Sequence, residues 1–132
     1  MIPISERNDR IRRIQEQRAL LNREEQELSR PFVTDLELIP SFFVKLSEES
    51  NPTNKDNTKM FIYIIFALYS PTSCLGKTQR VGVRKRIAKL LRVSNAAVSI
   101  QFSDAKILYD KHTGFRREVD RLYGILTSDT NT

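Results

Sequence analysis

The clearest hydrophobic pattern lies in residues 83–111, where apolar positions recur at helical spacing on both sides of a short break. The first segment places its apolar positions on one face: Val83, Ile87, Leu90 and Leu91. The second repeats at intervals of four, three and four: Val98, Phe102, Ala105 and Tyr109. Ser94 stands where it can cap the second helix, which we expect to reach about Lys111. The pattern predicts two helices joined by a short turn, which must cross steeply.

Two further apolar segments flank this helix pair. Residues 59–70, KMFIYIIFALYS, are apolar on nearly every side. No partner strand of comparable quality exists, so we expect a buried helix, capped by Thr58 and ended by Pro71. Residues 114–126 place their apolar side chains at helical spacing and predict a closing helix: Phe115, Val119, Leu122 and Leu126. The predicted fold class is therefore all-α, a compact helical domain preceded by a long N-terminal helix.

The N-terminal helix is expected from about Ser5 to Arg30, ending before Pro31. Its apolar residues follow a heptad track, and we predict that four of them take part in oligomerisation: Ile11, Ile14, Leu21 and Leu28. Ile4 lies on the same track, which then meets Arg18 and Glu25. Such a helix buries too little of itself to stand alone. It either pairs with its copy as a coiled coil or lies across the rest of the domain.

Residues 31–47 carry scattered apolar side chains interrupted by Pro40, which fits either a bent strand or a short helix that closes the core. Residues 48–58 are polar and predict an exposed loop, where we place the boundary of the C-terminal domain. The predicted organisation is an N-terminal arm at 1–30, a linker and core-closing segment at 31–56, a helical domain at 57–126 and a disordered tail at 127–132.

Charge is unevenly spread along the chain. The net charge is +6 and the pI is about 9.7. Between residues 77 and 92 there are seven basic residues and no acidic one: Lys77, Arg80, Arg84, Lys85, Arg86, Lys89 and Arg92. A merely solvated helix face usually mixes signs, because like charges at i, i+4 oppose the helix. A polyanion is therefore the expected partner.

Residues 84–105 resemble the helix-turn-helix class of DNA-binding proteins. Ala88 matches the small residue of the first helix against which the second helix packs. The apolar positions that hold such a pair together are matched by Ile87, Leu91, Val93 and Val98. Arg92 stands where that class usually has glycine, and Gln101 occupies a late apolar position. The resemblance implies that the start of the second helix enters the major groove of double-stranded DNA.

The expected contacts follow from this placement. Four residues on the exposed N-terminal face of the second helix are the predicted base contacts: Asn95, Ala96, Ser99 and Ser103. Basic residues of the first helix and of the segment before it are the predicted phosphate contacts: Lys77, Arg80, Arg84, Lys85, Lys89 and Arg92. Few base-reading arginines are present, so each subunit should have modest specificity and an oligomer should raise it.

No sequence feature supports an enzyme, a cofactor or a metal site. The Gly76–Thr78 tripeptide lacks the preceding glycine and strand of a phosphate-binding loop. His112 and Cys74 are the sole histidine and cysteine and have no partners near in sequence. There is no secretory signal, and the longest apolar run is half of a membrane span, so we expect a cytoplasmic protein without membrane contact.

Three functions fit these features. The first is a small DNA-binding transcription regulator that acts as a dimer through its N-terminal helix. The second is a phage DNA-packaging or replication adaptor that resembles a small terminase subunit and forms a ring. The third is an interaction or structural protein whose basic helix docks on an acidic partner without DNA.

Overall fold

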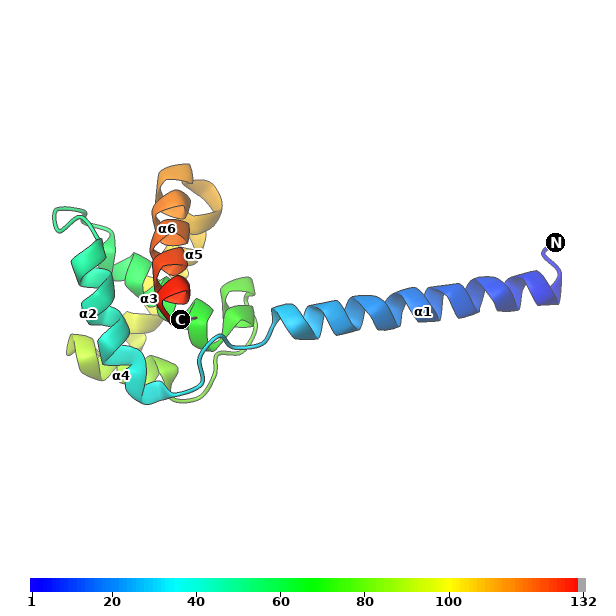
Figure 1. Cartoon of the computed structure of the whole chain (residues 1–132), viewed down its shortest axis with the longest axis horizontal. Helices are drawn as coiled ribbons and strands as arrows, with labels where there is room; N and C mark the ends of the chain where they lie inside the picture. Colours follow the sequence, from blue (N-terminus) through cyan, green and yellow to red (C-terminus); the bar gives the residue numbers. More distant parts are fainter. Residues whose placement is uncertain (131–132) are drawn as a thin grey trace. The chain divides into compact units, whose positions relative to one another are not determined.

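The computed structural model describes residues 1–130, with side chains to residue 128, and the chain divides into two units, Met1–Arg30 and Pro31–Thr132. The described residues form α-helices and two short 3-10 helices but no strand (Figure 1), so the predicted all-α class is confirmed. The elements are α1 (Ile4–Leu28), η1 (Leu36–Leu38), α2 (Ile39–Glu49), α3 (Asn57–Tyr69), η2 (Pro71–Leu75), α4 (Val83–Leu91), α5 (Asn95–Lys111) and α6 (Thr113–Thr130).

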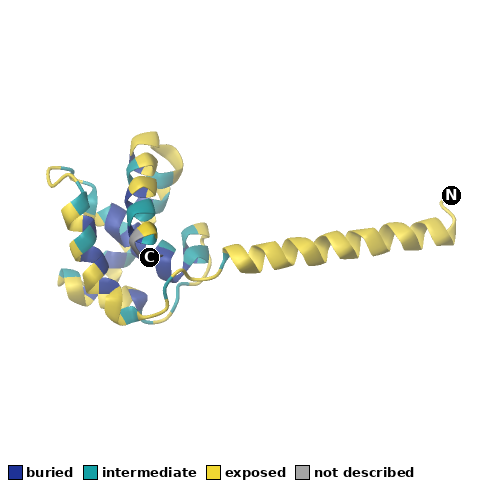
Figure 2. Ribbon diagram, viewed as in Figure 1, coloured by how far each residue is buried: buried dark blue, intermediate teal, exposed yellow. Residues whose placement is uncertain are grey.

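The first unit consists of α1, in which no residue is buried (Figure 2). The helix begins at Ile4, one residue before the predicted Ser5, and Pro3, with φ −59° and ψ 151°, is the non-helical residue that precedes it. Ser5 therefore lies inside the first turn, and no side chain caps this end. The helix ends at Leu28, two residues before the predicted end at Arg30.

The second unit is organised around α3. Nine of its residues are buried, and α2, α4, α5, α6 and η2 all pack against it. The aromatic side chains of α3 continue across the core, since Phe66 stacks on Phe102 of α5 with ring centroids 4.1 Å apart. The prediction of a central buried helix in this segment, with an amphipathic helix pair and a closing helix around it, agrees with the structure.

Residues 31–56 belong to this second unit, which places the unit boundary at Arg30 and Pro31 and not within the polar loop at 48–58. Of the two alternatives for residues 31–47, the structure has the helix. α2 buries Ile39, Phe42, Phe43 and Leu46, whose spacing of three, one and three suits one helix face. Pro40 does not interrupt α2, because it stands in the first turn, where its missing N–H costs nothing.

Asn54 shapes the start of α3. Its side chain accepts a hydrogen bond from the Asp56 N–H at 2.9 Å, and the helix begins at Asn57. Thr58, the predicted cap, therefore lies within the helix. The end of α3 holds the beginning of the second unit, since the carbonyl of Leu68 accepts hydrogen bonds from the N–H groups of Phe32 and Val33 at 2.8 and 3.2 Å.

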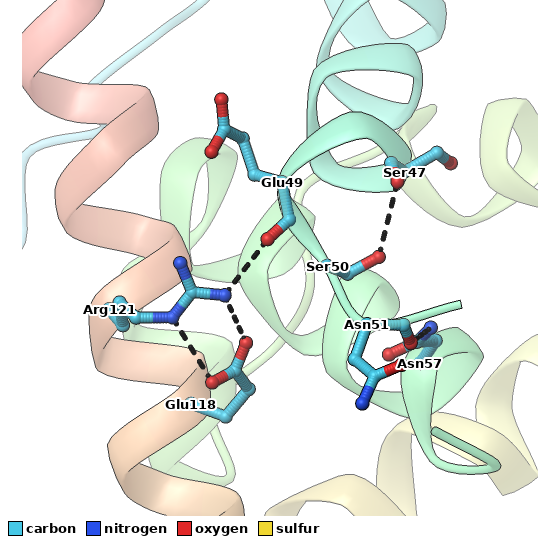
Figure 3. A network of polar contacts seen from close by, with 7 residues as sticks. All are labelled: Ser47, Glu49, Ser50, Asn51, Asn57, Glu118 and Arg121. Atoms are coloured by element: carbon cyan, nitrogen blue, oxygen red, sulfur yellow. Dashed lines mark hydrogen bonds and ion pairs between the residues drawn. The ribbon is translucent and has the colours of Figure 1, made fainter. Parts of the chain in front are cut away.

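Arg121 braces α6 against the end of α2 (Figure 3). Its guanidinium donates to the carbonyl oxygen of Glu49 at 2.9 Å and pairs with the Glu118 carboxylate. α6 continues past the predicted end at 126 as far as Thr130, so residues 127–130 of the predicted tail are helical. Residues 131–132 of that tail lie outside the described part of the chain.

Within the described residues, none of the helices has the length and apolar character required to cross a bilayer.

Candidate nucleic-acid interface

The entry to α4 is shaped by Gly82. Its φ of +94° lies in the left-handed region, which glycine adopts without strain. A Cβ at this position would stand 3.1 Å from Leu36 Cδ1, so the site is crowded as well as strained for any other residue. From Gly82 the chain turns directly into α4, whose buried face consists of Val83, Ile87 and Ala88. The basic side chains of α4 are consequently left on its outer face.

The turn between α4 and α5 is left-handed at Arg92, with φ 58° and ψ 45°. This is the position where the resemblance expects glycine, and the backbone has the conformation that glycine favours although arginine occupies it. The N–H of Val93 donates to the carbonyl of Ala88 at 3.0 Å and closes the turn. The Ser94 hydroxyl accepts a hydrogen bond from the N–H of Ala97 at 3.0 Å, so the predicted cap of α5 is confirmed.

A pocket of about 520 Å³ lies where the segment before α4 meets the first turn of α5. Its lining residues are Thr78, Gln79, Arg80, Val81, Gly82, Arg84, Lys85 and Asn95. The pocket therefore brings together three of the predicted phosphate contacts and one predicted base contact. It carries three cationic side chains and no acidic one. Because the starts of two helices also lie beside it, the local field favours an anion.

Arg80 is held against the core rather than on a free arm. Its backbone N–H donates to Ser70 Oγ at 3.1 Å, and its guanidinium lies 6.0 Å from the centroid of the Tyr69 ring. The Nη1 atom is buried and has no hydrogen-bond partner among the described residues. Because Arg80 lines the pocket, its guanidinium adds a positive charge beside it, which suits an oxyanion.

Arg84 and Ser99 contact each other across the helix pair. The guanidinium of Arg84 donates to Ser99 Oγ at 3.1 Å, which links the first turn of α4 to α5. Ser99 is only partly exposed, whereas Asn95 and Ala96 are exposed at the start of α5. The Arg84 contact therefore orients one predicted base contact, and Asn95 is the more accessible of the two.

Lys85 and Lys89 lie on the outer face of α4, Arg92 follows at its end, and all three are exposed. No ion pair involves any of the three within the described residues. Their neighbour Arg86, in contrast, pairs with Glu37 of η1 at 2.7 Å. Lys89 and Arg92 line a second groove, of about 410 Å³, together with Glu37 and the side chains of η1 and α2. Lys85 lines the first pocket, and Lys85 and Lys89 together line a further hollow of about 660 Å³ between η1 and α4.

Lys77 and Ser103 lie outside the pocket. Lys77 is exposed in the segment before α4, and Ser103 is exposed two turns along α5 from Asn95. The face of α5 that carries Ser103 also exposes Ile100 and Ile107, whose exposed fractions are 62% and 55%. Two of the predicted base contacts, Ala96 and Ser103, therefore stand in a partly apolar stripe.

Four of the residues that line the pocket were not predicted from the sequence: Thr78, Gln79, Val81 and Gly82. None of them carries a charge. A usable signal was present, since Gly82 directly precedes the amphipathic run and is typical of a special backbone conformation at a helix entry.

The remaining titratable groups provide no second site. Burial raises the pKa of the Cys74 thiol to about 11 and that of Tyr69 to about 12. Cys74 thus stays a protonated thiol at neutral pH, which argues against a nucleophile. No group of three or more metal-binding side chains exists within the described residues.

Replacing Arg92 with glycine is expected to raise the free energy of unfolding by about 0.5–1 kcal/mol. Relief of left-handed backbone strain, about 1–2 kcal/mol, outweighs the greater freedom of glycine in the unfolded chain. Urea denaturation followed by circular dichroism measures the change. The matched control is Lys89→Gly in the last turn of α4, where the backbone is right-handed, and it should lower the free energy of unfolding by up to about 1 kcal/mol. Equal destabilisation by both variants would contradict the left-handed turn.

Comparison of the chain with protein-family models, with curated proteins and with solved structures finds no match.

Proposed function

We propose that this protein binds double-stranded DNA through α4 and α5, with the start of α5 in the major groove. The observation that carries the proposal is the pocket at the start of both helices, which Arg80, Arg84 and Lys85 line together with Asn95. Phosphate contacts position a protein on the duplex and base contacts specify the sequence. A cluster of cations beside an exposed amide at a helix start supplies both kinds of contact.

Each residue type has a distinct role in this proposal. Asn95 is exposed and pairs with adenine through its amide, while Ala96 contacts a thymine methyl group. Ser99, oriented by Arg84, bonds to a base edge, and Ser103 contacts the next base along the groove. Exposed cations on α4 and before it bind phosphates on either side: Lys77, Arg84, Lys85, Lys89 and Arg92. Arg80 reaches a phosphate only within the pocket.

The proposed biological role is a small transcription regulator that acts as a homo-oligomer, with a dimer as the first expectation. A DNA-packaging or replication adaptor uses the same interface but assembles as a ring. The mass of the assembly separates the regulator from the adaptor, because the first should be a dimer and the second a ring. A dimer would read a DNA site with twofold symmetry.

A second candidate, docking on an acidic protein, is favoured by the groove beside α4. A hollow of about 450 Å³ there is lined by Pro40, Phe43, Val44 and Leu90 among others. Val44 is 59% exposed, and the basic groove of Lys89 and Arg92 also includes Leu90. Apolar side chains beside cations suit an amphipathic acidic segment.

Titration of a fluorescent 30-base-pair duplex at a series of salt concentrations from 50 to 200 mM tests the DNA proposal. Each phosphate contact contributes about −0.9 to the slope of log affinity against log salt, so the five exposed cations predict about −4.5 per subunit. An acidic peptide of equal charge serves as the competitor. No binding at 50 mM salt, or preferential binding of the peptide, would overturn the proposal and favour the second candidate.

A further inference from the structure

α1 is a helix of 25 residues in which no residue is buried. Its apolar side chains are nevertheless large, and Ile11, Ile14 and Leu21 are 47%, 50% and 64% exposed. An isolated helix that exposes a regular apolar stripe gains most of its stability from whatever covers that stripe. The charges along the stripe indicate which helix can cover it and whether that helix runs parallel or antiparallel to α1.

The stripe is a heptad seam with two tracks, a and d. The a positions are Ile4, Ile11, Arg18 and Glu25, and the d positions are Arg7, Ile14, Leu21 and Leu28. Five of these eight residues are apolar and three are charged. All eight are exposed. The three charged positions discriminate between the two ways in which copies of this helix can pair.

In a parallel pair in register, every seam residue faces its own copy. Arg7 then faces Arg7, Arg18 faces Arg18 and Glu25 faces Glu25, which gives three layers of like charge. Like charges held at close range in a partly desolvated seam are strongly unfavourable. A parallel pair of α1 therefore opposes itself at three of its eight layers.

In an antiparallel pair, a positions face d positions of the partner. With Ile4 opposite Leu28, the same register places Arg7 opposite Glu25 and Ile11 opposite Leu21. Ile14 then faces Arg18, whose aliphatic stem packs while its charged end reaches water. Four of the five apolar seam residues thus meet apolar residues, Arg7 meets Glu25, and no like-charge layer remains.

The charges outside the seam favour the same direction. Arg10 and Glu24 occupy the flanking g positions, which face each other in the antiparallel register. Residues 4–15 hold four arginines against two acids, whereas residues 17–28, which they face, hold two arginines against three acids. The positive half of one helix therefore lies on the negative half of the other. The antiparallel arrangement also places the positive end of each helix dipole beside the negative end of the other, which is favourable.

We propose that α1 pairs with α1 of a second copy as an antiparallel two-stranded coiled coil in which Arg7 faces Glu25. The occupant of the seam is thus a second copy of this chain. Each Leu28 lies opposite Ile4 of the other copy, which is 24 residues along the helix from that copy's own Leu28. At 1.5 Å per residue, the two Leu28 residues lie about 36 Å apart. The compact units are therefore attached at opposite ends of the coiled coil.

Charge exchange between Arg7 and Glu25 tests the direction in the full chain. Arg7→Glu and Glu25→Arg each create two like-charge layers and should weaken the dimer at least about 10-fold, whereas the double variant should return it to within about 3-fold of wild type. Each single change improves the interaction with the helix dipole, so weakening cannot arise from loss of helix. Sedimentation velocity over a range of concentrations measures the dissociation constants.

The matched control is Arg13→Glu and Glu27→Arg, which make the same charge changes at c positions outside the seam and should leave the dimer unchanged. In a parallel pair, the single seam variants merely exchange one like-charge layer for another. Single variants that dimerise as tightly as wild type would therefore overturn the proposal. So would a wild-type chain that is monomeric at all concentrations, or a dimer that persists after deletion of residues 1–30.

Cross-linking gives a second, independent measurement. In a Cys74→Ser background, chains with Ile4→Cys mixed with chains with Leu28→Cys should form the mixed disulfide on mild oxidation, and neither variant alone should cross-link. Cross-linking of each variant with itself would show a parallel pair and overturn the proposal. Neither experiment contains DNA, so the outcome is separate from that of the DNA titration.

Discussion

The double variant Lys85→Glu, Lys89→Glu is expected to bind duplex DNA at least about 100-fold more weakly than wild type at 100 mM salt, with a log–log salt slope shallower by about 2. Both lysines are exposed on the outer face of α4, and Lys85 lines the pocket beside Asn95. Reversal of charge removes two phosphate contacts and places two carboxylates against the duplex. Fluorescence anisotropy at several salt concentrations measures both effects.

The control for this variant is Lys55→Glu, Lys111→Glu, which changes the net charge by the same amount. Lys55 lies in the turn before α3 and Lys111 at the far end of α5, and both are exposed. We expect the affinity of the control to stay within about 3-fold of wild type, since neither residue belongs to the interface. Equal loss in both variants would show attraction by net charge alone, and an unchanged Lys85→Glu, Lys89→Glu variant would contradict the interface.

Neither pair of substitutions should perturb the fold. Lys85 and Lys89 have no ion-pair partner within the described residues, and exposed side chains of this kind change stability by about 0.5 kcal/mol or less. Circular dichroism at 222 nm and the urea midpoint provide the check. A variant that retains both but loses DNA affinity has lost contacts and not structure.

The parts of the interface that depend on local sequence could be predicted. Ser94 caps α5 through a hydrogen bond three residues along the chain, and the apolar spacing on either side fixes the buried face of each helix. The glycine expected at position 92 is absent, yet the backbone there is left-handed. The apolar packing of α4 and α5 against α3 thus imposes the turn, and Arg92 adopts the left-handed backbone that glycine would favour.

The parts that depend on distant residues could not be predicted. Arg86 and Glu37 are 49 residues apart in sequence, and their ion pair removes one cation from an otherwise uniform basic run. Arg80 lies over Tyr69 with a buried nitrogen atom, which no spacing in the chain indicates. The start of the second unit depends on distant residues too. The polar loop before Asn57 is typical of a boundary, but the buried face of α2 before that loop packs in the same unit as α3.

Replacing Phe102 with alanine is expected to lower the free energy of unfolding by about 3–5 kcal/mol, a large part of the 5–15 kcal/mol typical of a domain. Phe102 is 1% exposed and stacks on Phe66 of α3. Its ring also lies 6.2 Å from that of Tyr63, measured between centroids. Removal of the ring leaves a cavity between α3 and α5 at the point where α5 is anchored. The melting temperature should fall by more than about 12 °C.

The same variant separates anchoring of α5 from direct contact with DNA. Phe102 is buried and touches no nucleic acid in the proposed complex, so at a temperature where the variant is folded its affinity should fall only as far as the start of α5 loses its fixed position. The control is Ile107→Ala on the exposed face of the same helix, which should cost less than about 1 kcal/mol, because its side chain is already 55% exposed. Thermal melts of the two variants measure the contrast, and equal melting temperatures would contradict the packing of α5 on α3. Since α5 carries both Asn95 and Ser99 and is anchored by Phe102, any loss of affinity in the folded variant measures displacement of the start of α5 and not the loss of a DNA contact.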